Sequence, residues 1–144
     1  MFEIYHTTLS GLWLVLATIS VQALVAVGAH RRQKKMIPGI VDPKLGHDSF
    51  VFRSDRTFRN SLENIIPFFG LSVLAMLAGF DAGRLGIVVW VFALARLVHM
   101  VLYYRIATEV NPSPRSYFFI IGLFASAYLL VDVGRHLISM ALAG

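Results

Sequence analysis

The sequence contains no cysteine, which excludes disulfide bonds and metal sites built on thiolates. It also lacks the glycine-rich loop that holds phosphates, the paired histidines of a zincin and the nucleophile elbow of serine hydrolases. Charged residues make up only 15% of the 144 residues, and the chain has no internal repeat and no low-complexity segment. Nothing in the pattern therefore indicates a nucleotide-binding enzyme, a zinc protease or a serine hydrolase.

Apolar residues dominate what is present. They account for 57% of the chain, more than a soluble domain of this length needs, and the mean hydropathy is strongly positive. A transmembrane helix needs about 20 residues to cross a bilayer, and four apolar segments reach that length, at residues 5–29, 58–80, 85–107 and 116–142. The sequence predicts an all-α integral membrane protein, with one four-helix transmembrane domain over residues 1–144. The first segment is too long, and too weakly basic at its start, for a signal peptide.

The connections between these segments predict how the helices meet. Only Asp81–Arg84 separates the second segment from the third, so we expect a tight antiparallel hairpin with Gly83 as the breaker. Residues equally far from this turn should be level with each other, which puts Glu63 beside Tyr103. The Asn111–Pro114 stretch holds two prolines and should end the connection before the fourth helix.

Basic residues gather in two of the connections. Cytoplasmic loops of membrane proteins carry an excess of Lys and Arg. The first loop has Arg31, Arg32, Lys34, Lys35, Lys44, Arg53 and Arg56, and the third has Arg105 and Arg115, against Arg84 and Arg135 on the opposite side. We therefore predict that the first and third loops are cytoplasmic and that both termini lie on the other side of the membrane.

Two polar faces interrupt the apolar helices. An ionisable group at the centre of a membrane helix costs about 2.5–3.5 kcal/mol on insertion scales, so it usually faces a bundle interior or a site. Helical spacing places each set on a single face. The sets are Arg56, Arg59, Asn60 and Glu63 at the second helix and Arg96, His99 and Tyr103 on the third. They predict either a shared polar cavity for a ligand or internal pairs, in which Glu63 neutralises Arg59 or Arg96 and nothing is bound.

The side chains that would line such a cavity restrict the ligands it could bind. Arginine forks bind carboxylates in a bidentate way, and a lone glutamate beside them would suit an ammonium group. A molecule with two carboxylates and one amine fits, and glutathione is such a molecule. A nearby arginine would favour its thiolate over the thiol, whose free pKa is about 8.5. These arguments permit glutathione without selecting it over another anion.

Three motifs, in order on the second, third and fourth helices, carry a family resemblance. They are Arg59-Asn60-Ser-Leu-Glu63-Asn64-Ile-Ile-Pro67-Phe68, then Ala95-Arg96-Leu-Val-His99-Met-Val-Leu-Tyr103, then Pro114-Arg115-Ser116. Together with the basic end of the first helix, they resemble the MAPEG family, membrane-associated proteins of eicosanoid and glutathione metabolism. That family includes the microsomal glutathione transferases and the membrane prostaglandin E synthase.

The resemblance implies a homotrimer of four-helix subunits with glutathione in a cleft between neighbours. It implies that arginines hold the carboxylates of glutathione, that Glu63 holds the γ-glutamyl amine and that Tyr103 positions the peptide. The full glutathione-binding set carried over is Arg31, Arg59, Asn60, Glu63, Arg96, His99 and Tyr103.

The resemblance also implies a catalytic residue. Arg115 resembles the arginine proposed to stabilise the thiolate, with Ser116 beside it, and Arg105 is the alternative. The linker from Tyr103 to Arg115 is longer than in the eicosanoid enzymes, and Met100 stands where a threonine is common in animal members. Both departures point to a divergent bacterial member, and hence to a bacterial inner membrane.

The sequence thus leads to a membrane-bound glutathione transferase that acts on lipophilic electrophiles, with peroxidase activity on lipid hydroperoxides as a further expectation. No metal is expected, and glutathione is the co-substrate. Two alternatives stay open: a non-enzymatic membrane protein of the same fold, and a site for another anionic thiol or a lipid headgroup.

Overall fold

The computed structural model describes residues 2–34 and 36–143, and these form four long helices with no β-strand among them. The helices are α1 (Phe2–His30), α2 (Phe50–Leu77), α3 (Ala82–Arg105) and α4 (Pro114–Ala143). All four are long and apolar enough to cross a membrane, judged by length and composition. The prediction of an all-α, four-helix integral membrane fold is confirmed.

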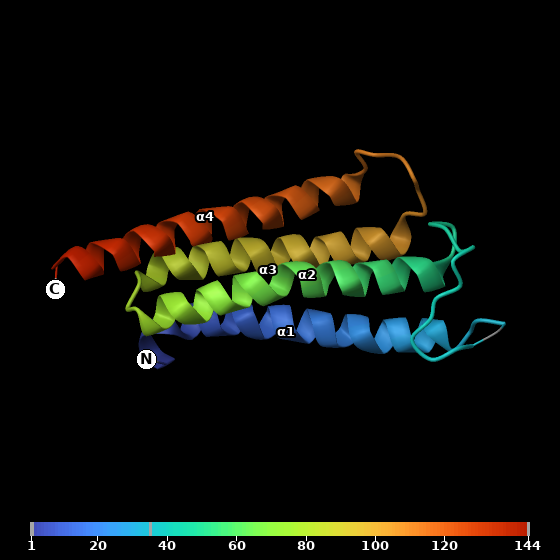
Figure 1. Ribbon diagram of the computed structural model, residues 1–144, viewed down its shortest axis with the longest axis horizontal. Helices are drawn as coiled ribbons and strands as arrows, with labels where there is room; N and C mark the ends of the chain where they lie inside the picture. Colours follow the sequence, from blue (N-terminus) through green and yellow to red (C-terminus); the bar gives the residue numbers. More distant parts are fainter. Residues whose placement is uncertain (1, 35, 144) are drawn as a thin grey trace.

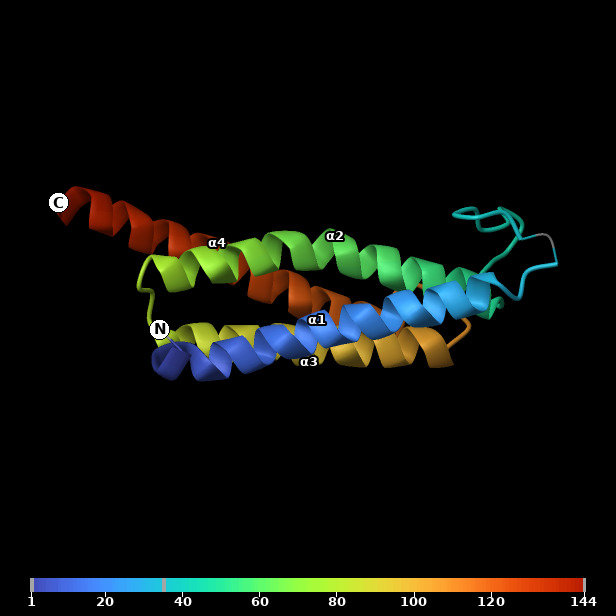
Figure 2. The ribbon, with the colours of Figure 1, turned by 90° about the horizontal axis from the view of Figure 1, so that it is seen from below.

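The helices run side by side along one axis of the molecule (Figure 1 and Figure 2). The α1–α2 and α3–α4 connections lie together at one end, which we call the loop end (Figure 1). The α2–α3 hairpin lies at the opposite end, where α1 begins and α4 ends. Helices α2 and α3 are central, because α1 and α4 each contact both of them, whereas α1 and α4 make no contact with each other in the described part of the chain.

The core is a seam of apolar side chains between these helices. Phe68 of α2 and Phe92 of α3 stack with their ring centroids 3.7 Å apart, and both are fully buried together with Leu129 of α4. Large apolar side chains also remain on the outer surface of the subunit, among them Trp13, Leu24, Ile66 and Phe124. A bundle that is apolar on its outer surface as well as inside is suited to a lipid environment.

Gly79, not Gly83, ends α2. Its φ of +66° lies in the left-handed region that favours glycine. The Gly79 N–H donates to the Met76 carbonyl and the Phe80 N–H donates to the Ala75 carbonyl, at 3.2 and 2.9 Å. These two bonds form a Schellman motif, which satisfies carbonyls at the helix end. The prediction that Gly83 breaks the chain is wrong, because Gly83 lies in the first turn of α3.

The earlier turn changes which residues face each other across the hairpin. Asp81 caps α3 by accepting a hydrogen bond from a backbone N–H of the first turn, so the helix begins at Ala82. Asn60 of α2 then lies at the same height in the bundle as Arg96 of α3, and the two side chains are hydrogen-bonded. The predicted level pairing of Glu63 with Tyr103 is therefore wrong, since it assumed a turn several residues further along.

Helix α2 begins at Phe50, well before the predicted start near residue 58. Its polar first turns are helical because Arg53, Ser54 and Thr57 are buried against the bundle. Arg53 donates to the carbonyl of Tyr104 at the end of α3 as well as to the preceding loop. Hydropathy alone locates the apolar span and misses a polar extension that is held by tertiary contacts.

We expect replacement of Gly79 by alanine to lower the free energy of unfolding by about 1 kcal/mol, because a Cβ is disfavoured in the left-handed region. No other atom lies within 4 Å of the added Cβ, so the cost is conformational. Gly83→Ala is the matched control, since its Cβ would meet only Asp81 Oδ1 at an ordinary 3.6 Å. Unfolding in detergent measures both variants, and a larger loss for Gly83→Ala would contradict this assignment of the turn.

Candidate functional site

Arg96 is buried in the middle of the bundle, with 1% of its surface exposed. Its Nη2 donates to Asn60 Oδ1 at 2.8 Å and to Ser61 Oγ at 3.0 Å, so the charge lies against α2. The aliphatic part of the side chain packs near Gly122 of α4. The arginine therefore links three helices.

No carboxylate pairs with Arg96 within the described part of the chain. Its Nε and Nη1 atoms are buried without a hydrogen-bond partner there. Asn60 and Ser61 are thus its polar partners, and both are reached through Nη2. Glu63, the partner considered from the sequence, is exposed on the surface of α2.

A second cluster lies at the loop end and consists of His47, His99, Tyr103 and Arg115; we call it the tyrosine cluster. The Arg115 guanidinium carbon sits 4.2 Å from the centre of the Tyr103 ring, a cation–π contact. The His99 ring centroid lies 5.5 Å from the same ring, and His47 Nε2 lies 3.2 Å from the Tyr103 hydroxyl oxygen. Three elements thus meet at one tyrosine: the α1–α2 connection, α3 itself and the start of α4.

Arg115 is buried and already partly bonded. Its guanidinium donates to the carbonyls of Thr108 and Ile106, at 2.7 and 3.4 Å. Because a guanidinium carries five N–H donors, these two bonds leave donors available for an anion. Ser116 instead takes part in a turn, accepting from the Ser113 N–H at 3.2 Å. Arg105, the alternative catalytic arginine, is the exposed last residue of α3.

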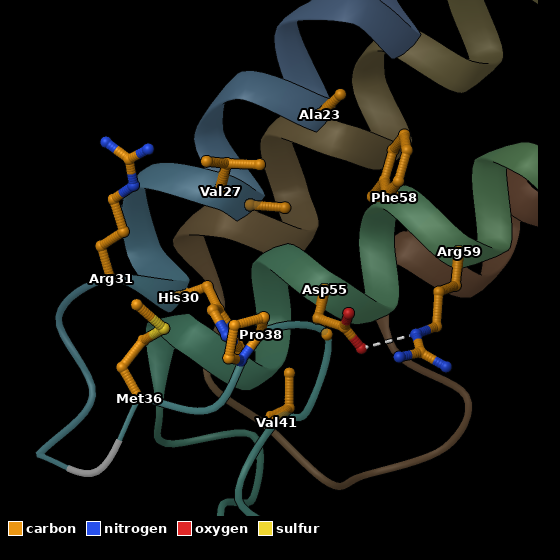
Figure 3. Close-up of a pocket in the computed structure, with 12 residues that line it drawn as sticks. Ala23, Val27, His30, Arg31, Met36, Pro38, Val41, Asp55, Phe58 and Arg59 are labelled. Atoms are coloured by element: carbon orange, nitrogen blue, oxygen red, sulfur yellow. Dashed lines mark ion pairs between the residues drawn. The ribbon is translucent and has the colours of Figure 1, made fainter.

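A pocket of about 720 Å³ opens between α1, α2 and their connection. Figure 3 shows Arg31 and Arg59 at its two sides, with Asp55 between them and apolar side chains deeper in. Arg59 Nε pairs with Asp55 Oδ2 at 2.9 Å, one helical turn away. The predicted internal pair of Arg59 with Glu63 is thus replaced by a pair with Asp55.

Apart from Asn60 and Arg96, which bond each other between α2 and α3, the predicted site residues described here fall into two groups on different helix pairs. Arg31 and Arg59 line the α1–α2 pocket, to which neither α3 nor α4 contributes. Tyr103, His99 and Arg115 belong to α3 and α4. Because α1 and α4 lie on opposite sides of the central helices, one subunit does not gather both groups into one cleft.

Comparison with known proteins shows which family the chain belongs to. The sequence matches the MAPEG family over residues 8–134, nearly the whole chain. The chain belongs to the MAPEG family. No match was found among curated proteins or among solved structures. The resemblance inferred from the three helix motifs is confirmed, and membership places the protein in a family that includes glutathione transferases and related members.

Three residues near the MAPEG motifs were missed by the sequence reasoning. Asp55 pairs with Arg59, Arg53 holds the loop backbone, and His47 reaches Tyr103. Asp55 and Arg59 are spaced i, i+4 on a helix, a signal that a longer predicted α2 would have revealed. His47 lies outside the helices, so no periodicity in the sequence could place it.

Within the tyrosine cluster, His47 is the titratable residue that lies outside the membrane-spanning helices. Its pKa is lowered below the usual 6.5, first by partial burial and then by the positive charges of Arg115, Arg56 and Arg53, with Glu109 acting in the opposite direction. A histidine with a lowered pKa is neutral at pH 7. The tyrosine cluster therefore carries the charge of Arg115 beside a neutral imidazole.

Proposed function

We propose that the protein is a membrane-bound glutathione transferase that conjugates glutathione to lipophilic electrophiles and also reduces lipid hydroperoxides. Glutathione would be the co-substrate, and the second substrate would arrive through the lipid. Membership of a family that includes glutathione transferases supports this proposal. The arginine-rich polar residues within an otherwise apolar bundle support it independently, because such groups are retained in membranes at functional sites.

One observation carries the proposal: Arg31 and Arg59 lie apart from Tyr103 and Arg115, in two places that we propose are half-sites for glutathione. The first is the α1–α2 surface with Arg31, Arg59 and the exposed Glu63. The second is the α3–α4 end with Tyr103 and Arg115. A ligand that contacts both needs a second copy of the chain, so we propose that the α1–α2 surface of one subunit faces the α3–α4 end of its neighbour. A closed ring of three such heterologous contacts would give the homotrimer.

Each half-site would bind a different part of glutathione. Arg31 and Arg59 would bind its carboxylates, with Arg59 leaving Asp55 or sharing it, and Glu63 would bind the γ-glutamyl ammonium. Asn60 would offer its amide to the peptide while Arg96 fixes that amide in place. His99 would support the ring of Tyr103.

Arg115 would supply the chemistry by stabilising the glutathione thiolate. A cation beside a thiol lowers its pKa and so raises the fraction of the reactive thiolate. The thiolate sulfur would attack an electrophilic carbon, forming a C–S bond as the leaving group departs with its electron pair. With a hydroperoxide, the sulfur would take the distal oxygen, releasing an alcohol, and a second glutathione would reduce the resulting sulfenic acid to a disulfide and water.

Glu63→Gln is expected to weaken glutathione binding by about tenfold or more, since a hydrogen bond to a charged group is worth roughly 1.5–3 kcal/mol. Calorimetry on the detergent-purified protein measures this, with the exposed Glu3→Gln as the matched control. A glutathione analogue without the γ-glutamyl amine should bind the wild type weakly and lose little more with Glu63→Gln. Equal affinity of wild type and variant for intact glutathione would refute the assignment of Glu63.

The α1–α2 pocket favours lipid binding as a second candidate function, because most of its lining residues are apolar. They include Ala23, Ala26, Val27 and Phe58. An anionic lipid could place its headgroup between Arg31 and Arg59 and its chain along this lining. The protein would then be a non-enzymatic lipid-binding member of the family. Absence of glutathione binding at millimolar concentration, together with saturable binding of an anionic lipid, would favour this candidate.

A further inference from the structure

His47 connects the loop end of the bundle to the tyrosine cluster. It belongs to the α1–α2 connection, far in sequence from Tyr103, yet its Nε2 lies 3.2 Å from the tyrosine hydroxyl. The two rings are also in contact, with centroids 5.9 Å apart. Among the described residues, this histidine provides the one hydrogen bond to the Tyr103 hydroxyl. The contact therefore decides how that hydroxyl is oriented.

The position of His47 is fixed from several directions. The buried Arg53 donates to the backbone carbonyls of His47 and Asp48. The ring of Phe52 meets the imidazole edge-on at 5.0 Å. Glu109, from the α3–α4 connection, approaches Nδ1 at 3.9 Å. Contacts to α2 and to the α3–α4 connection thus hold the imidazole against Tyr103.

The charges around His47 favour one tautomer. The carboxylate of Glu109 lies on the Nδ1 side, which favours a proton on Nδ1. Nε2 of the neutral ring is then an acceptor, and the Tyr103 O–H donates to it. The cations that face His47 are Arg53 and Arg56 from α2 and Arg115 from α4, and they disfavour a second proton.

We propose that His47 is a positioning residue that sets the direction of the Tyr103 hydroxyl, and that its protonation reverses this hydrogen bond. With neutral His47, the tyrosine proton points to the imidazole and the oxygen lone pairs are free to accept from a ligand N–H. Protonated His47 donates to that oxygen instead, so the tyrosine becomes a donor to the ligand. The consequence for glutathione rests on the proposed function, whereas the link between His47 and Tyr103 does not.

The link is tested by the titration of His47 in the detergent-purified full chain, followed by NMR of labelled histidines. His47→Gln identifies the resonance by its disappearance. Tyr103→Phe keeps the ring under Arg115 but removes the hydroxyl that donates to the neutral imidazole and accepts from the protonated one. Because a hydrogen bond from a charged donor is about twice as strong as a neutral one, the pKa of His47 should fall. An unchanged or higher pKa in Tyr103→Phe would overturn the proposal.

The consequence is tested by glutathione affinity from about pH 7.5 down to about pH 4.5, because the lowered pKa of His47 moves its titration below that of an ordinary histidine. In the wild type, affinity should fall about threefold on acidification, because the tyrosine oxygen no longer accepts from the peptide. His47→Gln, whose amide oxygen can accept from Tyr103, should match the wild type within about twofold at the upper pH and lack the acid step. His47→Phe should bind about fivefold more weakly at every pH.

His6→Gln is the matched control, because His6 is exposed near the start of α1 and bonds only its own helix. It should keep both the affinity and the acid step. If His47→Gln loses as much affinity as His47→Phe, or keeps the acid step, the positioning role is wrong. If the wild type binds no glutathione at any pH, the proposed function fails, and the NMR titration still decides whether His47 directs Tyr103.

Discussion

Arg115→Ala is expected to remove the bound thiolate while sparing most of the glutathione affinity. The proposed role of Arg115 is to stabilise charge on sulfur, and other residues would hold the carboxylates and the amine. Loss of such an electrostatic donor costs roughly a hundredfold to a thousandfold in turnover. The ultraviolet absorbance of the thiolate reports this step without a second substrate, and calorimetry measures the affinity.

Arg115 also bonds two backbone carbonyls of the α3–α4 connection, so alanine could loosen that segment. Arg115→Lys keeps a positive charge but loses the forked donors, and should retain part of the thiolate signal. Arg105→Ala tests the alternative arginine, which is exposed at the end of α3, and should leave the signal intact. Equal loss of affinity and thiolate in both Arg115 variants would contradict the catalytic role.

The second large effect concerns stability and centres on Arg96. Asn60→Leu is expected to lower the free energy of unfolding by about 2 kcal/mol, because it removes a hydrogen bond from a buried cation. Arg96→Met removes the charge together with its need for partners, and should cost less. The double variant should therefore be more stable than Asn60→Leu alone.

Unfolding in detergent without glutathione measures all three proteins. The order expected is that Asn60→Leu is the least stable, with the double variant and Arg96→Met above it. Ser72→Ala serves as a control, since Ser72 is buried on the same helix but bonds only the Phe68 carbonyl. A double variant less stable than Asn60→Leu would show that Arg96 contributes to the fold through contacts other than Asn60.

The sequence predicted the helices well because membrane spans are defined by length and hydropathy, which are local properties. The four apolar segments and the family motifs needed no tertiary information. The hairpin was less well predicted, because Gly79 and Gly83 are both plausible breakers and only the hydrogen bonds around Gly79 decide between them. A shift of a few residues at this turn was enough to move the level partner of Arg96 to Asn60.

The candidate site was predicted as a set of residues but not as an arrangement. Helical spacing correctly placed Arg96, His99 and Tyr103 on one face, yet it did not reveal that Arg96 is buried against Asn60 and Ser61. The separation of the α1–α2 pocket from the tyrosine cluster depends on how four helices pack, which spacing within one helix does not contain. His47 reaches the cluster through a loop, whose path follows from contacts such as those of Arg53.

Mixed subunits test most directly whether two copies of the chain build one glutathione site. One subunit would carry Arg59→Ala with Glu63→Gln, which disables the α1–α2 half-site, and the other would carry Arg115→Ala, which disables the α3–α4 half-site. Each parent assembly should show almost no bound thiolate. Randomly co-assembled subunits in a closed ring would restore about a quarter of the interfaces, and hence about a quarter of the wild-type signal. A co-assembled sample with no more thiolate than its parents would contradict a site shared between neighbouring subunits.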